Sequence, residues 1–138
     1  MNTEEAKFYE YSKDFFNTAS SCIKVDFFNF SPTPYYLYCH SIELSLKSIL
    51  LSRTETNLKT VKKLGHDLNK ILKEIKDKNI LTKKDLKIIR MANSYYNSKG
   101  FEYYDPKKSN GDYSLLIEKW HIDDLHNIAK KLLDKIKK

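Results

Sequence analysis

A nearly apolar stretch over residues 35–53 constrains the fold of this chain more than any other feature. On a helix, at about 100° per residue, its side chains form two aliphatic stripes and one stripe of serines. These are Ile42, Leu46 and Ile49, then Leu37, Leu44 and Leu51, then Ser41, Ser45, Ser48 and Ser52. A helix with so little polar surface needs cover on most sides, so we expect residues 34–53 at the centre of the domain. The small serines let another backbone approach closely, and we expect a helix contact within the chain there rather than a dimer interface.

Four further segments carry helical signals, and composition agrees with an all-α fold. They are residues 3–28, a segment from about His66 to Ile75, a segment that starts at Thr82, and residues 122–137. Thr82 and Asp85 have the spacing of a capping box, with Leu81 and Leu86 in the hydrophobic-staple positions. Residues 54–63 are expected to form a spacer and residues 97–113 a long loop, which contains two of only three glycines.

Length and residue content predict one domain, residues 1–138, in the cytoplasm. No run of 18 apolar residues occurs, so we expect no membrane segment. The first residues lack the basic and apolar blocks of a secretion signal. Cys22 and Cys39 lie beside apolar residues in predicted helices, where cysteine usually behaves as a small hydrophobic side chain.

The positive charge is concentrated in one part of the chain. Residues 59–90 contain eleven Lys or Arg and four acidic residues, a net charge of +7, and the other residues balance to zero. This pattern fits a solvated lysine-rich face. It also fits a surface for weak, salt-sensitive binding of RNA or a nucleotide.

Charged residues within the apolar segment form a candidate site. His40, Glu43 and Lys47 fall on one helix face, and Glu43 and Lys47 are spaced as an i,i+4 ion pair. Because the helix is apolar on most sides, we expect this pair to be shielded from water and mutually bonded. Next along the chain, His66 and Asp67 stand at a predicted helix start, where one of them is expected to accept hydrogen bonds from free amides.

The same residues raise the question of a metal. His40 and Glu43 are half of a possible metal site, which His66 and Asp67 would complete. The spacing matches no zinc signature and paired cysteines are absent, so we expect no metal and no cofactor.

Aromatic residues in the predicted loop have two interpretations. The mixture of aromatic residues and lysines there suits the stacking of bases and the binding of phosphates: Phe101, Tyr103, Tyr104 and Trp120 are interleaved with Lys99, Lys107 and Lys108. In a chain with ten tyrosines, these aromatics are also expected to pack back onto the core.

Three motifs together resemble the HEPN superfamily. They are Glu-Leu-x-Leu-Lys-x-x-Leu from Glu43, Gly-His-Asp-Leu from Gly65, and an aromatic Tyr-Tyr-Asp-Pro loop before a final amphipathic helix. The resemblance implies an up-and-down bundle of four to five helices and a homodimer. The many apolar faces of the central helix also favour self-association. Many HEPN proteins are metal-independent ribonucleases of toxin–antitoxin or antiphage defence systems, and others bind nucleotides or partner proteins.

The nuclease motif of that superfamily, an Arg followed after four to six residues by a His, is absent. After Arg53 the corresponding positions are 58–60, after Arg90 they are 95–97, and neither range contains histidine. Lysine takes the arginine position in two pairs with six intervening residues, Lys59 with His66 and Lys119 with His126. Lysine lacks the planar fork with which arginine holds a phosphate.

We therefore expect a non-catalytic domain that binds a nucleotide-type ligand or an antitoxin-like protein partner. The expected binding residues are His40, Glu43, Lys47, His66, Asp67, Tyr103 and Tyr104. One alternative is a metal-independent ribonuclease toxin with a divergent site formed by His66, His126, Lys59 and Lys119. A second alternative is an RNA-binding module that uses the basic residues 59–90.

Overall fold

The computed structural model describes residues 3–22, 32–54, 56–77, 79–101 and 119–137, and of residues 119–121 only the backbone. The described part contains helices and no strand, so the all-α prediction is confirmed. The helices are α1 (Thr3–Cys22), α2 (Thr33–Arg53), α3 (Leu58–Lys63), α4 (Leu68–Glu74), α5 (Lys83–Tyr96) and α7 (Lys119–Lys137). None of the described helices is both long and apolar enough to span a bilayer.

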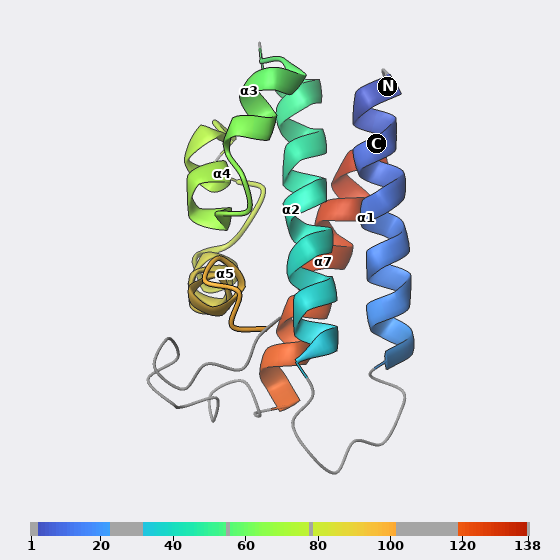
Figure 1. The fold of residues 1–138 in the computed structure, drawn as a ribbon, viewed down its shortest axis with the longest axis vertical. Helices are drawn as coiled ribbons and strands as arrows, with labels where there is room; N and C mark the ends of the chain where they lie inside the picture. Colours follow the sequence, from blue (N-terminus) through green and yellow to red (C-terminus); the bar gives the residue numbers. More distant parts are fainter. Residues whose placement is uncertain (1–2, 23–31, 55, 78, 102–118, 138) are drawn as a thin grey trace.

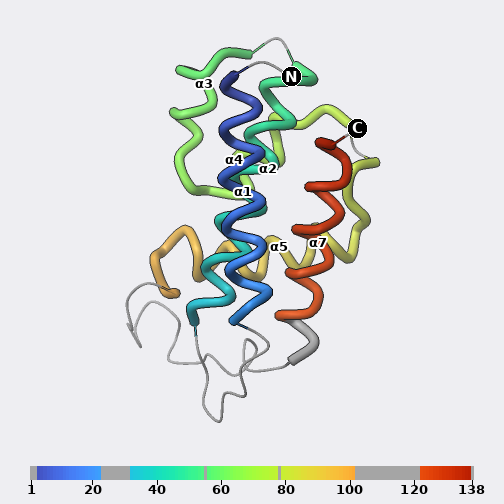
Figure 2. Tube along the Cα trace, turned by 90° about the vertical axis from the view of Figure 1, so that its right-hand side faces the viewer, coloured from blue at the N-terminus to red at the C-terminus, as the bar shows by residue number. Residues whose placement is uncertain are grey.

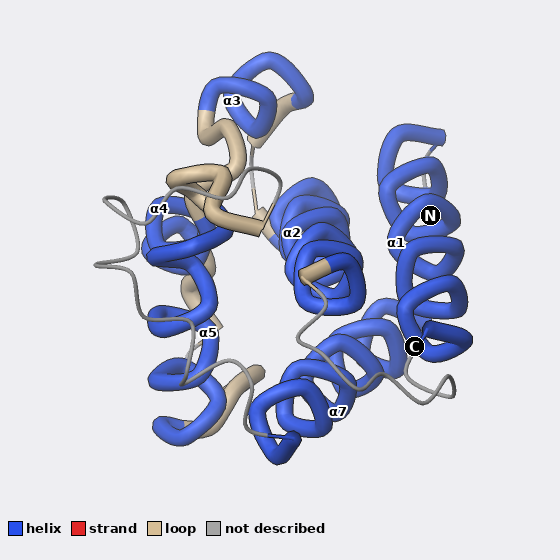
Figure 3. The backbone as a smooth tube through the Cα atoms, turned by 60° about the horizontal axis from the view of Figure 1, so that its bottom comes forward, coloured by secondary structure: helices blue, strands red, loops and turns tan. Residues whose placement is uncertain are grey.

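The helices form a bundle around α2. Helices α1, α2 and α7 run along the long axis, with α1 antiparallel to the other two (Figure 1). Helices α3 and α4 lie on the opposite side of α2 from α1 (Figures 1 and 3). Helix α5 runs across the bundle, and the start of α1 and the end of α7 lie at the same end of the molecule (Figure 2). The predicted helical bundle is confirmed, with α5 as a transverse member.

Helix α2 is covered on all sides over most of its length. Every residue from 41 to 51 is buried, including the charged Glu43 and Lys47. This confirms the central position predicted from its apolar stripes. It also removes one reason to expect self-association, because the apolar faces of α2 are covered within one chain. The homodimer stays a prediction that depends on the family resemblance.

The serine stripe of α2 packs against α1. Ser12 on α1 is fully buried, and its hydroxyl donates to the carbonyl of Ser41 at 2.7 Å and lies 2.6 Å from Ser45 Oγ. Ser41 Oγ donates in return to the carbonyl of Ser12 at 2.9 Å, and Ser48 Oγ donates to the carbonyl of Glu5 at 3.1 Å. These bonds confirm the expected contact within the chain.

Helix boundaries differ from the predictions between α2 and α5. Residues 58–63, expected to be a spacer, form α3, which Asn57 caps by accepting from the amide of Thr60 at 2.9 Å. Asparagine at such a position is a strong helix-start signal, and this signal was missed. Helix α4 begins at Leu68 rather than near His66, because a turn with Gly65 at φ 63° precedes it. Helix α7 begins at Lys119, and most of the predicted 97–113 loop and the end of the predicted first helix lie outside the described residues.

The predicted capping box at the start of α5 is present. Thr82 Oγ1 accepts from the amide of Asp85 and Asp85 Oδ2 accepts from the amide of Thr82, both at 3.0 Å. Lys131 on α7 also donates to Asp85 Oδ2 and so joins the two helices. Burial alone would raise the pKa of Asp85, but the bonds from Lys131 and Thr82 outweigh burial and hold that pKa below its usual value.

Asp85→Asn is expected to lower the free energy of unfolding by about 1–2 kcal/mol near neutral pH. Because the folded pKa of Asp85 is depressed, its contribution is present above the unfolded value of about 3.9 and is lost as the pH falls through the folded pKa. Thermal melts of both proteins should therefore converge at strongly acidic pH. Asp134→Asn, on the exposed side of α7, is the control and should change little. A destabilisation by Asp85→Asn that is equal at all pH values would contradict this role.

Candidate functional site

Glu43 is a buried carboxylate that accepts hydrogen bonds from three side chains. It is 1% exposed. Its Oε1 accepts from the Tyr96 hydroxyl at 2.5 Å and from His66 Nδ1 at 2.8 Å, and its Oε2 accepts from Lys47 Nζ at 2.9 Å. The three donors come from three parts of the chain, namely α5, the turn between α3 and α4, and α2 itself. The predicted shielded pair of Glu43 and Lys47 is therefore confirmed as the centre of a larger cluster.

The donors keep Glu43 ionised in spite of its burial. Burial alone would raise the pKa of this carboxyl, since it penalises the charged form. The bonds from Tyr96, Lys47 and His66 and the Lys47 charge outweigh that effect and hold the pKa of Glu43 below its usual value. Burial, and then the Glu43 charge, raise the pKa of Tyr96, so the Tyr96 hydroxyl keeps the proton that it donates.

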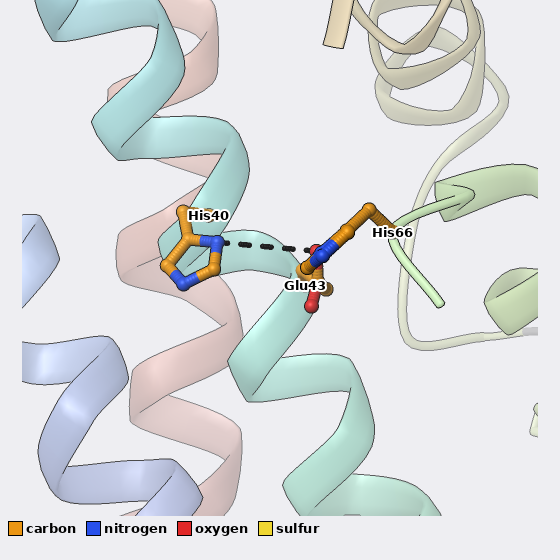
Figure 4. A group of neighbouring side chains, drawn as sticks. All are labelled: His40, Glu43 and His66. Carbon is orange, nitrogen blue, oxygen red and sulfur yellow. Dashed lines mark hydrogen bonds and ion pairs between the residues drawn. The ribbon is translucent and has the colours of Figure 1, made fainter. Parts of the chain in front are cut away.

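His66 connects this buried carboxylate to the protein surface. Its side chain is 65% exposed, although its Nδ1 is bonded to a carboxylate that water does not reach. The preceding Gly65 has φ 63°, a left-handed conformation that costs glycine little and that lets the turn bring His66 over α2. Figure 4 shows His66 approaching Glu43 from the side opposite His40. Because a carboxylate only accepts, Nδ1 carries the proton and Nε2 is the remaining ring nitrogen.

His40 is connected to the same carboxylate through Tyr96. Its Nδ1 lies 2.7 Å from the Tyr96 hydroxyl. The same nitrogen lies 3.9 Å from Glu43 Oε1 (Figure 4). Tyr96 has one hydroxyl proton and donates it to Glu43, so His40 Nδ1 donates to the Tyr96 oxygen. The His40 and His66 ring centroids lie 6.2 Å apart. One buried carboxylate thus orients two imidazoles, one directly and one through a hydroxyl.

Asp67 caps the start of α4 and is not one of the hydrogen-bond partners of Glu43. Its Oδ1 accepts from the amide of Asn69 at 3.0 Å at the start of α4, as predicted for a helix cap. The same Oδ1 accepts from Asn93 Nδ2 at 3.0 Å, and Asn93 Oδ1 accepts from the amide of Leu68 at 3.0 Å. Asn93 and Asp67 therefore join α5 to the start of α4, next to the turn that carries His66.

The other predicted site residues either lie outside this cluster or fall outside the described part of the chain. His126 on α7 packs against Phe16, and its Nδ1 lies 2.8 Å from the Tyr38 hydroxyl. Burial, and then the Lys130 charge, lower the pKa of His126, so a neutral ring accepts the Tyr38 proton. Lys59 is exposed on α3. The Lys119 side chain and the expected binding residues Tyr103 and Tyr104 lie outside the described part.

Tyr96 and Asn93 belong to the site but were not predicted as functional residues. Both lie on the buried face of α5, where the sequence pattern indicated only core packing for Tyr96. A signal did exist, because Asn93 is an amide three residues from Tyr96 on an otherwise apolar helix face. A buried amide needs hydrogen-bond partners and so predicts a polar contact.

The donor set of the cluster has two chemical capacities. His40, Glu43 and His66 each offer one ligand atom, and these atoms all lie within 4.8 Å of one another, so the three residues can hold a metal ion. Without a metal, a carboxylate that fixes an imidazole tautomer is an arrangement used for proton transfer and for binding anions.

Exposed lysines lie on α3 and α4, the two helices that the turn with His66 joins. The turn that carries His66 joins α3 to α4, and ten of the eleven Lys and Arg of residues 59–90 are described and exposed. Of the four acids in this range, Asp67 and Asp85 are engaged in helix caps.

Comparison with known families gives one match that covers nearly the whole chain. A family model described as HEPN domain matches residues 6–138. No curated protein and no solved structure matches the chain significantly.

Proposed function

The chain belongs to the HEPN domain family, and from this membership and its charged cluster we propose a module that binds a nucleotide-type ligand without cleaving RNA. The observation that carries the proposal is His66, an imidazole that is 65% exposed and is oriented by a carboxylate that is 1% exposed. A fixed, accessible ring within a lysine-rich surface suits recognition of a phosphate group.

The bonding of the cluster explains how the ligand group is held. Glu43 orients His66 through Nδ1, so the ring meets the ligand through Nε2 and, as an imidazolium, donates from Nε2 to a phosphate oxygen. Lys47 offsets the Glu43 charge, so the carboxylate does not repel an incoming anion strongly. Exposed lysines of α3 and α4 supply long-range attraction that salt screens.

Arginine geometry supports a role without catalysis. Arg53 ends α2, ten residues and thus about 15 Å along the helix from Glu43. Its guanidinium donates to the carbonyl of Lys135 at 3.1 Å and lies 3.9 Å from Asp77. Neither contact involves a residue of the Glu43 cluster, so the Arg53 guanidinium is engaged outside that cluster.

We further infer that the domain acts as a homodimer beside an antitoxin-like protein, in a toxin–antitoxin or antiphage setting. Family membership supports this inference. Among the described residues the one exposed large apolar side chain is Tyr11, at 66%. The dimer contact is therefore expected to be largely polar over the described surface.

The second candidate function is a metal-independent ribonuclease, and the paired imidazoles favour it. Cleavage at the 2′-hydroxyl needs one group that removes a proton and another that returns one to the leaving oxygen. His40 and His66, with ring centroids 6.2 Å apart and a shared carboxylate, have the chemistry for these two roles.

Nucleotide binding should be measured with a fluorescent adenine nucleotide in buffer that contains EDTA. We expect saturable binding that weakens as salt is added. His66→Ala should weaken it about tenfold, because a hydrogen bond to a charged group contributes roughly 1.5 kcal/mol. The His66 side chain is mostly exposed, so this variant should fold normally.

Two lysine pairs provide the matched control. Replacing Lys62 and Lys63 on α3 by alanine should weaken binding, whereas replacing Lys7 and Lys13 on α1 should not, although the net charge changes equally. Equal binding by the wild-type protein and His66→Ala would contradict the proposal. RNA cleavage in EDTA that is lost in both His66→Ala and His40→Ala would select the ribonuclease.

A further inference from the structure

We propose that His40, Glu43 and His66 form a binding site for one divalent transition-metal ion of the Zn²⁺ type. Two imidazoles with one carboxylate are a donor set that binds Zn²⁺ and related ions in proteins. Such a metal site does not depend on the proposed nucleotide binding.

The three donors are already close to a binding geometry. Glu43 Oε1 lies 2.8 Å from His66 Nδ1 and 3.9 Å from His40 Nδ1, and all three ligand atoms lie within 4.8 Å of one another. Donors on a tetrahedral zinc ion lie about 3.4 Å apart, as follows from bond lengths of about 2.0–2.1 Å. His66 is exposed and follows Gly65, so a small rotation of its side chain can lengthen its 2.8 Å separation from Oε1 to that value, and the 3.9 Å separation of His40 from Oε1 exceeds it by only about 0.5 Å.

The site combines rigid and accessible ligands. His40 and Glu43 are spaced i,i+3 on α2, the spacing that turns two side chains toward the same point in helical metal sites. His40 is 17% exposed and Glu43 is 1% exposed, so α2 holds both of them firmly. The 65% exposed His66 provides the route from solvent and the side on which further ligands, such as water, can coordinate.

Neighbouring groups leave one carboxylate oxygen for the ion. Lys47 donates to Oε2, which orients the carboxylate and leaves Oε1 as a single donor. In the metal-free protein, Oε1 accepts protons from His66 and Tyr96. A cation between the three ligand atoms takes the place of these two hydrogen bonds.

Binding through Nδ1 shifts the proton of each imidazole and needs no net change in charge. His40 and His66 carry the proton on Nδ1 when no metal is bound, as their acceptors require. On coordination, each neutral ring binds the metal through Nδ1 and carries its proton on Nε2. The Tyr96 proton stays on the hydroxyl, which turns away from Oε1.

The charge of Lys47 limits the affinity. The site offers one carboxylate whose charge a lysine already offsets, so the attraction for a dication comes mainly from the imidazoles. This favours Zn²⁺, Co²⁺ or Ni²⁺ over Mg²⁺ and Ca²⁺, which prefer several oxygen ligands.

Titration of the purified full chain with Co²⁺ and Zn²⁺, without nucleotide, tests the site. We expect one Co²⁺ per chain with a visible absorption band of low-coordinate geometry, which Zn²⁺ displaces and Mg²⁺ does not. His66→Ala and His40→Ala should each weaken binding at least about tenfold. His126→Ala, which removes a histidine of α7 outside the cluster, should bind Co²⁺ as the wild-type protein does.

Nitrogen NMR of the histidine rings separates this site from weak surface binding. Zn²⁺ should move the protonated position of His40 and His66 from Nδ1 to Nε2 and leave His126 unchanged. The assignment is wrong if Co²⁺ does not bind, if His66→Ala binds equally well, or if the two tautomers stay as they are. These measurements use no nucleotide. A negative result would therefore not bear on the proposed nucleotide binding, which is tested separately.

Discussion

Lys47→Met should lower the free energy of unfolding by about 2–4 kcal/mol. Lys47 and Glu43 are 6% and 1% exposed, and their charged atoms lie 2.9 Å apart. Methionine fills similar space but donates no hydrogen bond, so the variant leaves an ionised carboxylate with two of its three donors. Urea unfolding at neutral pH measures the loss, which arises from an uncompensated buried charge.

The double variant Glu43→Gln, Lys47→Met is the control for this prediction. It removes both charges, so it should recover part of the stability that Lys47→Met loses. An unfolding midpoint of Lys47→Met equal to that of the wild-type protein would show that the pair does not stabilise the fold. A double variant less stable than the sum of the two single losses would also contradict the account.

Tyr96→Phe should lower the free energy of unfolding by about 1.5–3 kcal/mol, because the hydroxyl bonds a buried carboxylate. The hydroxyl lies 2.5 Å from Glu43 Oε1 and 2.7 Å from His40 Nδ1, so its loss weakens two contacts. The ring itself remains, so the packing of α5 against α2 should not change. Thermal unfolding followed by circular dichroism measures this effect.

Tyr11→Phe is the matched control, because it removes the hydroxyl of a tyrosine that is 66% exposed on α1. Its unfolding should resemble that of the wild-type protein. A double-mutant cycle with Glu43→Gln then tests the partner, and we expect a coupling energy of about 1 kcal/mol or more. Additive losses in the cycle would mean that the Tyr96 hydroxyl stabilises something other than Glu43.

Local patterns predicted the parts of the fold that depend on neighbours in sequence. The stripes of α2 predicted its central position, and the spacing of Thr82 and Asp85 predicted the start of α5. The ion pair of Glu43 and Lys47 was also predictable, because an i,i+4 spacing places both side chains on one turn of the same helix.

Parts that depend on distant contacts were not predictable in the same way. His66 reaches Glu43 across 23 residues and Tyr96 reaches it across 53, and no periodicity links these positions. The spacing along the chain therefore argues against a metal site, whereas folding brings the three donors together in space. Helix α3 was missed for another reason, since its six residues are too few for a hydrophobic period to emerge.

We propose that Glu43 orients His66 to meet a phosphate-bearing ligand at the basic surface. Nitrogen NMR of the histidine rings in EDTA tests it most directly, with an adenine nucleotide as the probe. Before addition, His66 should carry its proton on Nδ1 because it donates to Glu43. Addition should then bring a second proton to Nε2, which donates to the phosphate, and so shift the His66 Nε2 resonance in a saturable manner while leaving His126 in place. A His66 ring that is unchanged at saturating nucleotide, or one that carries its proton on Nε2 from the start, would contradict the account.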